Sequence, residues 1–289
     1  MGKILVIGST GNIGYYVVRE LVSKGHKVKA AVSNLVGGQK KLEGIACELT
    51  VLDLLKPETF EAALHNVDKL FLIRPPKLAK PRKDMKPFLD AVKANGVKHI
   101  VFVSLLGVEK NPVVPHRKIE DMISELEIPY TFLRPSFFMQ NLNTTHREDI
   151  KLRNELFMPV GKAKTSFIDT RDIATIAANC LTEKGHTNKS YTLTGSEPLD
   201  YYEVADILTD VLERKIEYKN PPTLKFRKTL IERGVEKSFA NVMTMLYIMT
   251  KLGTAKLVTS ETERLLKRKP ISFRQYAYDH KHYWDQGIR

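Results

Sequence analysis

The sequence predicts an α/β protein built on a doubly wound parallel sheet, followed by a smaller C-terminal lobe. Short apolar runs alternate with helix patterns, the runs are rich in branched and aromatic residues, and a glycine-rich turn follows the first run. Such alternation is typical of parallel βαβ units, whose strands are buried on both faces. The runs are ILVIG, KVKAAVS, CELTVLD, KLFLI and HIVFVS, which begin at residues 4, 27, 47, 69 and 99.

The helix patterns between these runs have recognisable faces and ends. Ile13, Val17 and Leu21 recur every four residues after the glycine turn and would line one face of a helix. The segment DMKPFLDAVKANG ends at Gly96, a residue type that favours the C-terminal cap. A later segment, HRKIEDMISELEIP, carries one apolar stripe, formed by Ile119, Met122, Ile123 and Leu126.

The regular alternation fades in the second half of the chain, which predicts two domains. We place the first domain over residues 1–153 and the smaller lobe over residues 154–289. The lobe contains a helix pattern in TRDIATIAANCLTEKG, a strand pattern in KSYTLTG and a further helix from Tyr201 to Glu213. We expect part of it, about 163–182, to pack back on the first domain.

Composition and cysteine usage narrow the class of protein. With 43% hydrophobic and 27% charged residues, the chain has the make-up of an ordinary globular protein. No apolar run approaches the roughly 20 residues that cross a bilayer, and the N-terminus lacks a secretory signal pattern, so no membrane association is expected. Cys47 and Cys180 are far apart, which predicts no metal site and a reducing, cytoplasmic compartment.

The formal net charge of +13 has three possible explanations. Basic residues can form a solvated surface, attract phosphorylated ligands or bind nucleic acid. The densest groups, Lys77–Lys86 and Arg264–Lys269, are short and lack the interleaved aromatic residues of a single-strand binding surface. We therefore favour a solvated surface and expect no nucleic-acid partner.

The turn after the first predicted strand has the context of a dinucleotide-binding loop of the Rossmann type. A strand runs directly into the turn, and a helix pattern follows it. Gly8 would allow the tight turn, Gly11 would let backbone N–H groups approach a pyrophosphate, and Gly14 would let the helix pack closely on the sheet. The phosphates would lie at the positive end of the helix. The predicted cofactor-binding residues here are Gly8, Ser9, Thr10, Gly11, Asn12, Ile13 and Gly14.

The GxxGxxG spacing of this turn resembles that of the short-chain dehydrogenase/reductase superfamily. In that superfamily an acidic residue after the third strand lies beside the adenine, and the resemblance assigns this position to Asp53. The alternative is that Asp53 only caps the end of its strand.

The end of the second predicted strand bears on cofactor choice. An acidic residue at this place binds the ribose hydroxyls of NAD, whereas a basic one receives the 2′-phosphate of NADP. Ser33 and Asn34 occupy it here, so no carboxylate would repel the 2′-phosphate. Lys40 and Lys41 follow closely and either assist or are merely solvated. We predict that NADPH is preferred and that NADH is possible.

Taken together, the motifs resemble the NmrA-like family of atypical short-chain dehydrogenases/reductases. They are VIGSTGNIG, LFLIRPP, HIVFVSLLGV, IPYTFLRPSFFMQNL, SFIDTRDIATIAANCLTE and KSYTLTGSEPLDYYEVADIL, and they cover most of the chain. The family contains NAD(P)H-dependent quinone and dye reductases, relatives of isoflavone reductase and regulators that bind the dinucleotide without turnover. The resemblance therefore implies a dinucleotide-binding domain with a substrate-binding lobe.

The usual Tyr-x-x-x-Lys pair of the superfamily is absent, because Val114 stands four residues before Lys118. Lys118 resembles, by its distance from Pro129, the active-site lysine of isoflavone reductase-like enzymes, which are thought to work without the tyrosine. His116 is a possible proton donor near neutral pH. Each of these candidate catalytic residues is alternatively an ordinary surface residue, and Lys118 also counts among the expected cofactor contacts.

The remaining candidate contacts follow later predicted strands. Open α/β sheets place ligands beyond the carboxyl ends of their strands, where Ser104 lies. By resemblance, the segment after IPYTFLR lies over the nicotinamide, and the residues after KLFL pass near the phosphates or ribose. These cofactor-binding candidates are Ile73, Arg74, Pro75, Ser104, Pro135 and Phe138.

Two functions remain open at this point. The first is an NAD(P)H-dependent reductase that passes a hydride to a small apolar electrophile such as a quinone or an aldehyde. The second is an NAD(P)-binding, redox-sensing regulator without turnover. A stripe in the lobe, formed by Val242, Met245, Leu246 and Met249, is either core or a flexible lid over an apolar substrate.

Overall fold

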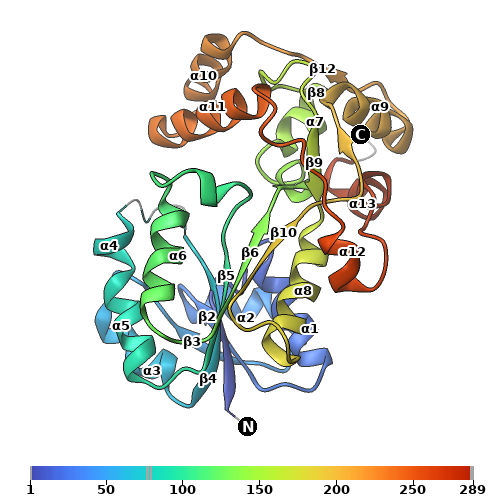
Figure 1. Ribbon diagram of the computed structural model, residues 1–289. Helices are drawn as coiled ribbons and strands as arrows, with labels where there is room; N and C mark the ends of the chain where they lie inside the picture. Colours follow the sequence, from blue (N-terminus) through green and yellow to red (C-terminus); the bar gives the residue numbers. More distant parts are fainter. Residues whose placement is uncertain (1, 76–77, 79, 287–289) are drawn as a thin grey trace. The chain divides into compact units, whose positions relative to one another are not determined.

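A seven-stranded parallel sheet forms the centre of the first of two structural units (Figure 1). The computed structural model describes residues 2–75, 78 and 80–286, so Pro76 and Lys77 of the sequence motifs lie outside the described residues. The first unit comprises Met1–Pro135 and Thr170–Leu193, and the second comprises Ser136–Asp169 and Thr194–Arg289. Among the described residues, no helix is long and apolar enough to cross a membrane.

The strand order of the sheet is β10-β6-β5-β4-β1-β2-β3. Because chain order reverses between β1 and β4, the carboxyl ends of these neighbouring strands flank a switch point, where open α/β sheets bind ligands. The predicted α/β class with a parallel central sheet is confirmed. The strands are β1 Lys3–Val6, β2 Val28–Val32, β3 Glu48–Val51, β4 Val67–Ile73, β5 His99–Val103, β6 Tyr130–Pro135 and β10 Lys189–Leu193.

Helices cover both faces of this sheet because their apolar stripes pack on its buried strands. On one face, α1 packs against α8, and on the other α3, α5 and α6 share a core with strand residues such as Leu72 and Phe102. The predicted stripe of Ile119, Met122, Ile123 and Leu126 belongs to this core. The helices are α1 Gly14–Ser23, α2 Leu35–Lys41, α3 Phe60–Leu64, α4 Pro81–Asp84, α5 Lys86–Ala94, α6 Pro115–Glu125 and α8 Thr170–Thr182; short 3-10 turns cover Pro57–Thr59 and Val108–Lys110.

The chain passes from one unit to the other three times, whereas the sequence prediction used a single boundary at residue 153. Residues 136–153 group with the second unit, and residues 170–193 group with the first. Of the segment 163–182 that we expected to pack on the first domain, α8 lies in the first unit and β9 in the second. The KSYTLTG strand, expected in the lobe, becomes β10 and pairs with β6 in parallel.

The second unit has two small sheets and an aromatic core. Strands pair in the orders β11-β9-β7 and β12-β8. Tyr201, Phe226, Tyr276 and Trp284 are almost fully buried in one hydrophobic cluster. The elements are β7 Phe137–Phe138, α7 Arg147–Arg153, β8 Glu155–Leu156, β9 Thr165–Ile168, β11 Pro198–Leu199, α9 Tyr201–Leu212, β12 Glu217–Tyr218, α10 Thr223–Glu232, α11 Lys237–Lys251, α12 Glu261–Leu266 and α13 Phe273–His280, with 3-10 turns at Met139–Asn141 and Lys281–Tyr283.

The apolar stripe predicted on α11 faces away from the core of its unit. Its side chains are 40–63% exposed, and they are Val242, Met245, Leu246 and Met249. The opposite face packs inward through Ala240, Met243 and Tyr247. The interpretation of the stripe as core is therefore wrong for this unit.

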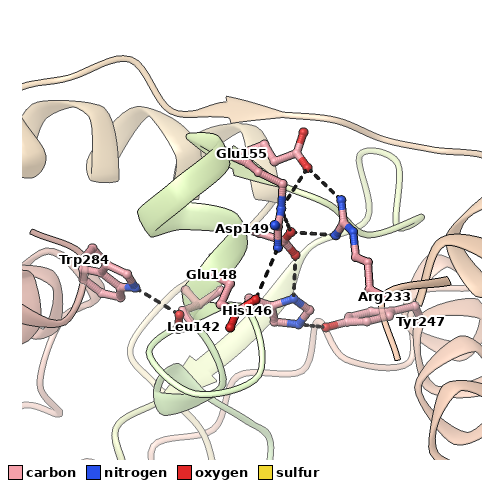
Figure 2. A network of polar contacts seen from close by, with 9 residues as sticks. Leu142, His146, Glu148, Asp149, Glu155, Arg233, Tyr247 and Trp284 are labelled. Atoms are coloured by element: carbon pink, nitrogen blue, oxygen red, sulfur yellow. Dashed lines mark hydrogen bonds and ion pairs between the residues drawn. The ribbon is translucent and has the colours of Figure 1, made fainter. Parts of the chain in front are cut away.

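A buried polar network around Asp149 ties three helices of the second unit together (Figure 2). Asp149 Oδ1 accepts from Arg153 Nε at 2.8 Å within α7 and from Arg233 Nη1 at 2.7 Å, next to α10. His146 places Nδ1 4.0 Å from Asp149 Oδ2 and Nε2 2.5 Å from the Tyr247 hydroxyl of α11. Burial by itself would raise the pKa of Asp149, but the bonds from His146 and Arg153 and the charge of Arg233 keep this pKa below its ordinary value.

We predict that Asp149→Asn lowers the free energy of unfolding at pH 7 by about 3 kcal/mol, because two arginines lose a buried partner. A carboxyl whose folded pKa is depressed stabilises the protein above its unfolded pKa of about 4, and this contribution disappears as the pH falls through the folded pKa. Urea unfolding from pH 7 downwards should therefore show the two proteins converging below about pH 4. Glu148→Gln, on the same helix but 79% exposed at its side chain, is the control and should change stability by less than about 0.5 kcal/mol. A constant difference at every pH contradicts the ionic origin of the effect.

Candidate functional site

The glycine turn between β1 and α1 is shaped by two close approaches. Gly8 has φ +73°, and a Cβ at this residue would lie 2.6 Å from Ile73 Cγ2. At Gly14 a Cβ would lie 2.2 Å from the carbonyl oxygen of Gly8, a separation that no side chain tolerates. The turn is closed by a hydrogen bond from Gly11 N to Gly8 O at 2.9 Å. Helix α1 therefore begins directly against the end of β1 only because both positions lack side chains.

The outer part of the turn offers main-chain groups to a ligand. Gly11 and Asn12 are exposed, whereas Ile13 is buried in the core. Ile13 is the N-cap of α1, it provides no side-chain cap, and the first turn of the helix has no acidic residue. The first N–H groups of a helix need acceptors and carry partial positive charge, which favours an anion such as a pyrophosphate.

Ser9 has a structural role that the sequence did not reveal. Its side chain is fully buried, and Oγ donates to the carbonyl oxygen of Ala31 at 2.6 Å. This bond joins the turn after β1 to the neighbouring strand β2. Ser9 as a whole is buried, while Thr10 is half-buried beside it.

Ser33, Asn34 and Asp53 follow the adjacent strands β2 and β3 on the other side of the turn. Ser33 and Asn34 are exposed, and Asn34 Oδ1 accepts from Gly37 N at 2.7 Å as the N-cap of α2. Asp53 is half-buried, and its Oδ1 accepts from Leu55 N at 3.0 Å. Asp53 thus caps the end of its strand, the alternative role expected for it, and it uses one carboxylate oxygen to do so.

Ile73, Arg74 and Pro75 follow β4, and Ser104 follows β5. Arg74 is half-buried, and its Nε donates to the Leu78 carbonyl oxygen at 2.9 Å, which shapes the loop after β4. Ser104 is only 4% exposed, its N–H donates to Leu133 O, and its hydroxyl has no hydrogen-bond partner among the described residues. A buried hydroxyl without a partner costs about 1–3 kcal/mol. Its position at the carboxyl end of a central strand therefore fits a bound ligand.

Helix α6 presents the two candidate catalytic side chains differently. The His116 ring stacks on Phe102 of β5 with centroids 6.1 Å apart, and burial together with the charge of Arg74 lowers the pKa of His116 to about 4. His116 is therefore neutral near pH 7, where a neutral ring can donate one N–H but is not an acid in the imidazolium form. Lys118 lies two residues further along the helix and is exposed.

A buried ion pair that sequence reasoning missed fixes α6 to the sheet. Arg134 of β6 donates from Nε and Nη2 to the two carboxylate oxygens of Glu120, at 3.0 and 2.7 Å, and Glu120 is 2% exposed. Arg134 Nη1 also lies 3.4 Å from Glu109, in the segment between β5 and α6. A bidentate pair sets both distance and angle. The helix that carries His116 is thereby held at a defined position on β6.

The first unit brings most of the predicted cofactor residues to one edge of its sheet. The turn residues, Ser33, Asn34, Asp53, Ile73, Arg74, Pro75, Ser104 and Pro135 all lie at or beyond the carboxyl ends of its parallel strands. Phe138 differs, because it belongs to β7 of the second unit. The crowded glycines, the uncapped start of α1 and the unpartnered Ser104 hydroxyl together fit a dinucleotide. In the described part of the chain, no cluster of three His, Cys, Asp or Glu residues could hold a metal ion.

Comparison with known proteins gives one consistent family. The model of the NmrA-like family matches residues 1–277. The NAD(P)H azoreductase of Xenophilus azovorans is 33% identical over 282 residues, which cover 96% of this chain and 97% of that protein. The Citrobacter sp. triphenylmethane reductase complexed with NADP(H) aligns with a TM-score of 0.83 and 25% identity, covering 95% of this chain and 99% of the other. An Escherichia coli NADPH-dependent quinone oxidoreductase complexed with NADPH shows the same fold, with a TM-score of 0.85 and 23% identity over 96% and 99% of the chains.

The geometry of the turn predicts two effects of Gly14→Ala, because the new methyl group forces α1 away from β1. The Kd for NADPH should rise more than about tenfold, and the protein should lose about 1–3 kcal/mol of stability. Fluorescence titration and thermal unfolding measure the two effects. Gly25→Ala is the control for a glycine outside the turn: Gly25, unlike Gly14, has positive φ, +78°, but a Cβ there meets nothing within 4 Å. It should lose about 1 kcal/mol of stability while keeping its affinity. Normal NADPH binding by Gly14→Ala would show that the close approach does not form the site.

Proposed function

Because the chain belongs to the NmrA-like family, we propose that it is an NAD(P)H-dependent reductase that transfers a hydride to a small apolar electrophile such as a quinone or an aldehyde. The observation that carries this proposal is the cradle formed by Gly8, Gly14 and the uncapped start of α1. The relatives named above are reductases that use NAD(P)H or NADPH or are complexed with NADP(H), and they support the same chemistry.

The protein's own contribution is to bind, orient and polarise. The main-chain N–H groups of Asn12 to Gly14 would hold the pyrophosphate, and the Ser104 hydroxyl would hydrogen-bond the cofactor or the acceptor. Bound NAD(P)H supplies the hydride, and a quinone acceptor needs little acid catalysis. The absence of the usual tyrosine, whose place is taken by Val114, is therefore compatible with turnover. The neutral state of His116 leaves Lys118 as the candidate for a charged group near the acceptor.

We also propose that NADPH is preferred over NADH. Neither Ser33 nor Asn34 brings a carboxylate to the end of β2, and the Asn34 oxygen is already bound to Gly37 N. A 2′-phosphate there meets no fixed negative charge, and the exposed Lys40 and Lys41 of α2 add positive charge nearby. The proposed preference for NADPH thus depends on the absence of a carboxylate that would repel the 2′-phosphate. It does not depend on an arginine that binds this phosphate.

Pure protein should oxidise NADPH in the presence of a neutral quinone faster than with an aliphatic aldehyde, because the quinone needs no proton donor at the hydride step. The measurement follows the absorbance of the reduced cofactor over a panel of both acceptor classes, with NADPH and NADH affinities determined in parallel. Saturable NADPH binding without turnover of any acceptor would favour the redox-sensing regulator instead.

Replacing the exposed lysine of α6 tests its assigned role. We expect Lys118→Ala to lower kcat about 10- to 100-fold while NADPH affinity stays within a few-fold, since the residue acts on the reaction and not on the phosphates. Lys93→Ala, on the neighbouring helix α5 and also exposed, should behave like the unmodified protein. Equal kcat values for Lys118→Ala and Lys93→Ala reject a catalytic role for Lys118.

A further inference from the structure

Helix α11 of the second unit carries an apolar face that its own unit leaves uncovered. We define this α11 apolar face by five residues that share one side of the helix at intervals of three and four residues. Each has 40–63% of its surface exposed, and they are Phe239, Val242, Met245, Leu246 and Met249. A contiguous exposed apolar patch that is rimmed by polar residues marks a site of interaction with a protein or a membrane.

The polar side chains that border the α11 apolar face are already engaged. Ser238 donates from its N–H and its hydroxyl to the Glu236 carboxylate, and Asn241 Oδ1 accepts from Arg227 Nε of α10 at 2.7 Å. A protein–protein interface carries about one hydrogen bond per 100–200 Å², and its strongest contacts come from Trp, Tyr and Arg. The mostly aliphatic and thioether side chains of this face therefore suit a fluid apolar phase better than a protein partner.

The two helices that carry and support the face form a basic segment. Residues 223–256 include seven basic and two acidic residues. Both acidic residues have partners, because Glu232 Oε1 lies 3.6 Å from Lys228 Nζ on α10 and Glu236 caps the start of α11. The bond from Arg227 to Asn241 also holds one guanidinium at the edge of the α11 apolar face. The surroundings of the face are thus positively charged.

The distribution of charge on α11 favours an anionic surface over a second copy of the chain. Its charged residues are its first and its last, Lys237 and Lys251, which are exposed and lie within two residues of Phe239 and Met249. Two copies of α11 packed lengthwise would set lysine against lysine at both ends, whichever way the helices run, and like charges across an interface repel. An anionic surface attracts both lysines across a Debye length of about 10 Å.

We propose that the α11 apolar face, together with the basic residues around it, docks the protein reversibly on an anionic lipid bilayer. The apolar side chains would enter the boundary between headgroups and acyl chains, and the lysines would lie at the level of the lipid phosphates. The expectation of no membrane association considered spanning segments and secretory signals, and a docked surface helix needs neither. This inference goes beyond the proposed reductase activity and depends on the second unit alone.

Co-sedimentation of the full chain with vesicles tests the docking. The vesicles consist of phosphatidylcholine, with or without about one third phosphatidylglycerol. Binding to the anionic vesicles should be at least about tenfold tighter than binding to the neutral ones in about 0.05 M salt. Most of this difference should vanish in about 0.5 M salt, because the Debye length shortens. Equal affinity for both kinds of vesicle, or binding to neither, overturns the proposal.

Substitutions locate the binding surface. Lys237→Gln should weaken binding to the anionic vesicles about fivefold, the contribution of one basic residue near such a surface, and Leu246→Ser should weaken it about tenfold. Lys215→Gln and Leu152→Ser are the matched controls, exposed in the same unit but outside the face, and they should bind like the unmodified protein. Equal losses in the variants and their controls would show that overall charge or apolar surface holds the protein, and would reject the α11 apolar face.

A fluorescent reporter reads the contact directly. The single tryptophan of the chain, Trp284, is fully buried, so an added tryptophan reports its own surroundings. Leu246→Trp keeps the face apolar, and its emission should shift to the blue on anionic vesicles and be quenched by brominated acyl chains. Leu152→Trp should keep its emission. If Leu246→Trp shows no shift on vesicles that carry the protein, the proposal is wrong.

Two other occupants of the face give different results. A second copy would produce a dimer in analytical ultracentrifugation without lipid, and Leu246→Ser would dissociate it. A lid over an acceptor would make Leu246→Ser lose kcat/KM for a water-soluble quinone in the absence of vesicles. Either result, combined with unweakened vesicle binding, contradicts the proposal. Vesicle binding requires no turnover, so a protein that binds NADPH but reduces no acceptor would refute the proposed function and leave this test intact.

Discussion

The close approach of α1 to the end of β1 is the constraint on which the candidate site depends. The Gly8 carbonyl oxygen occupies the space that a Gly14 side chain would need, so the first helix can begin within a few residues of the sheet. This placement aims the uncapped N–H groups of α1 across the carboxyl edge of the central strands. The buried bond from Ser9 to Ala31 then fixes the turn to β2. The anion binding proposed for this edge would follow from sterics first and from charge second.

A buried ion pair and an aromatic contact position the side chains around that edge. The bidentate pair between Arg134 and Glu120 sets α6 on β6, and α6 in turn presses His116 onto Phe102. Burial in this setting removes the charge of His116 at neutral pH, while the neighbouring Arg74 keeps its own. Two basic side chains of the same edge thus have different charge states. The difference begins with residue type, because an ordinary histidine is already mostly neutral at pH 7, and burial makes the neutral state of His116 complete.

The parts of the structure that could be predicted from the sequence are those with local causes. The first five strands, the glycine turn and the stripe of α6 depend on spacing within about 15 residues. Ser9 and Ala31 are 22 residues apart, and Arg134 and Glu120, although only 14 residues apart, belong to different elements, so the periodicity within one element carries no information about either pair. The hydrophobic periodicity of the sequence also could not predict which face of α11 packs inward. A stripe such as the one containing Met245 shows that a helix has an apolar face, but the face that packs inward is the one that carries Met243 and Tyr247, whose hydroxyl lies 2.5 Å from His146 Nε2.

The repeated exchange of the chain between the two units has a consequence for synthesis on the ribosome. The central sheet lacks its last strand, β10, and one of its covering helices, α8, until residue 193 has left the exit tunnel. Until then the strand surface that α8 later covers stays open to water and to chaperones, while the first part of the second unit has already emerged. Neither unit corresponds to a continuous stretch of chain, so a simple truncation cannot isolate either one. Domain-by-domain folding during translation, the usual route for larger chains, can therefore complete the first unit only after residue 193 has emerged.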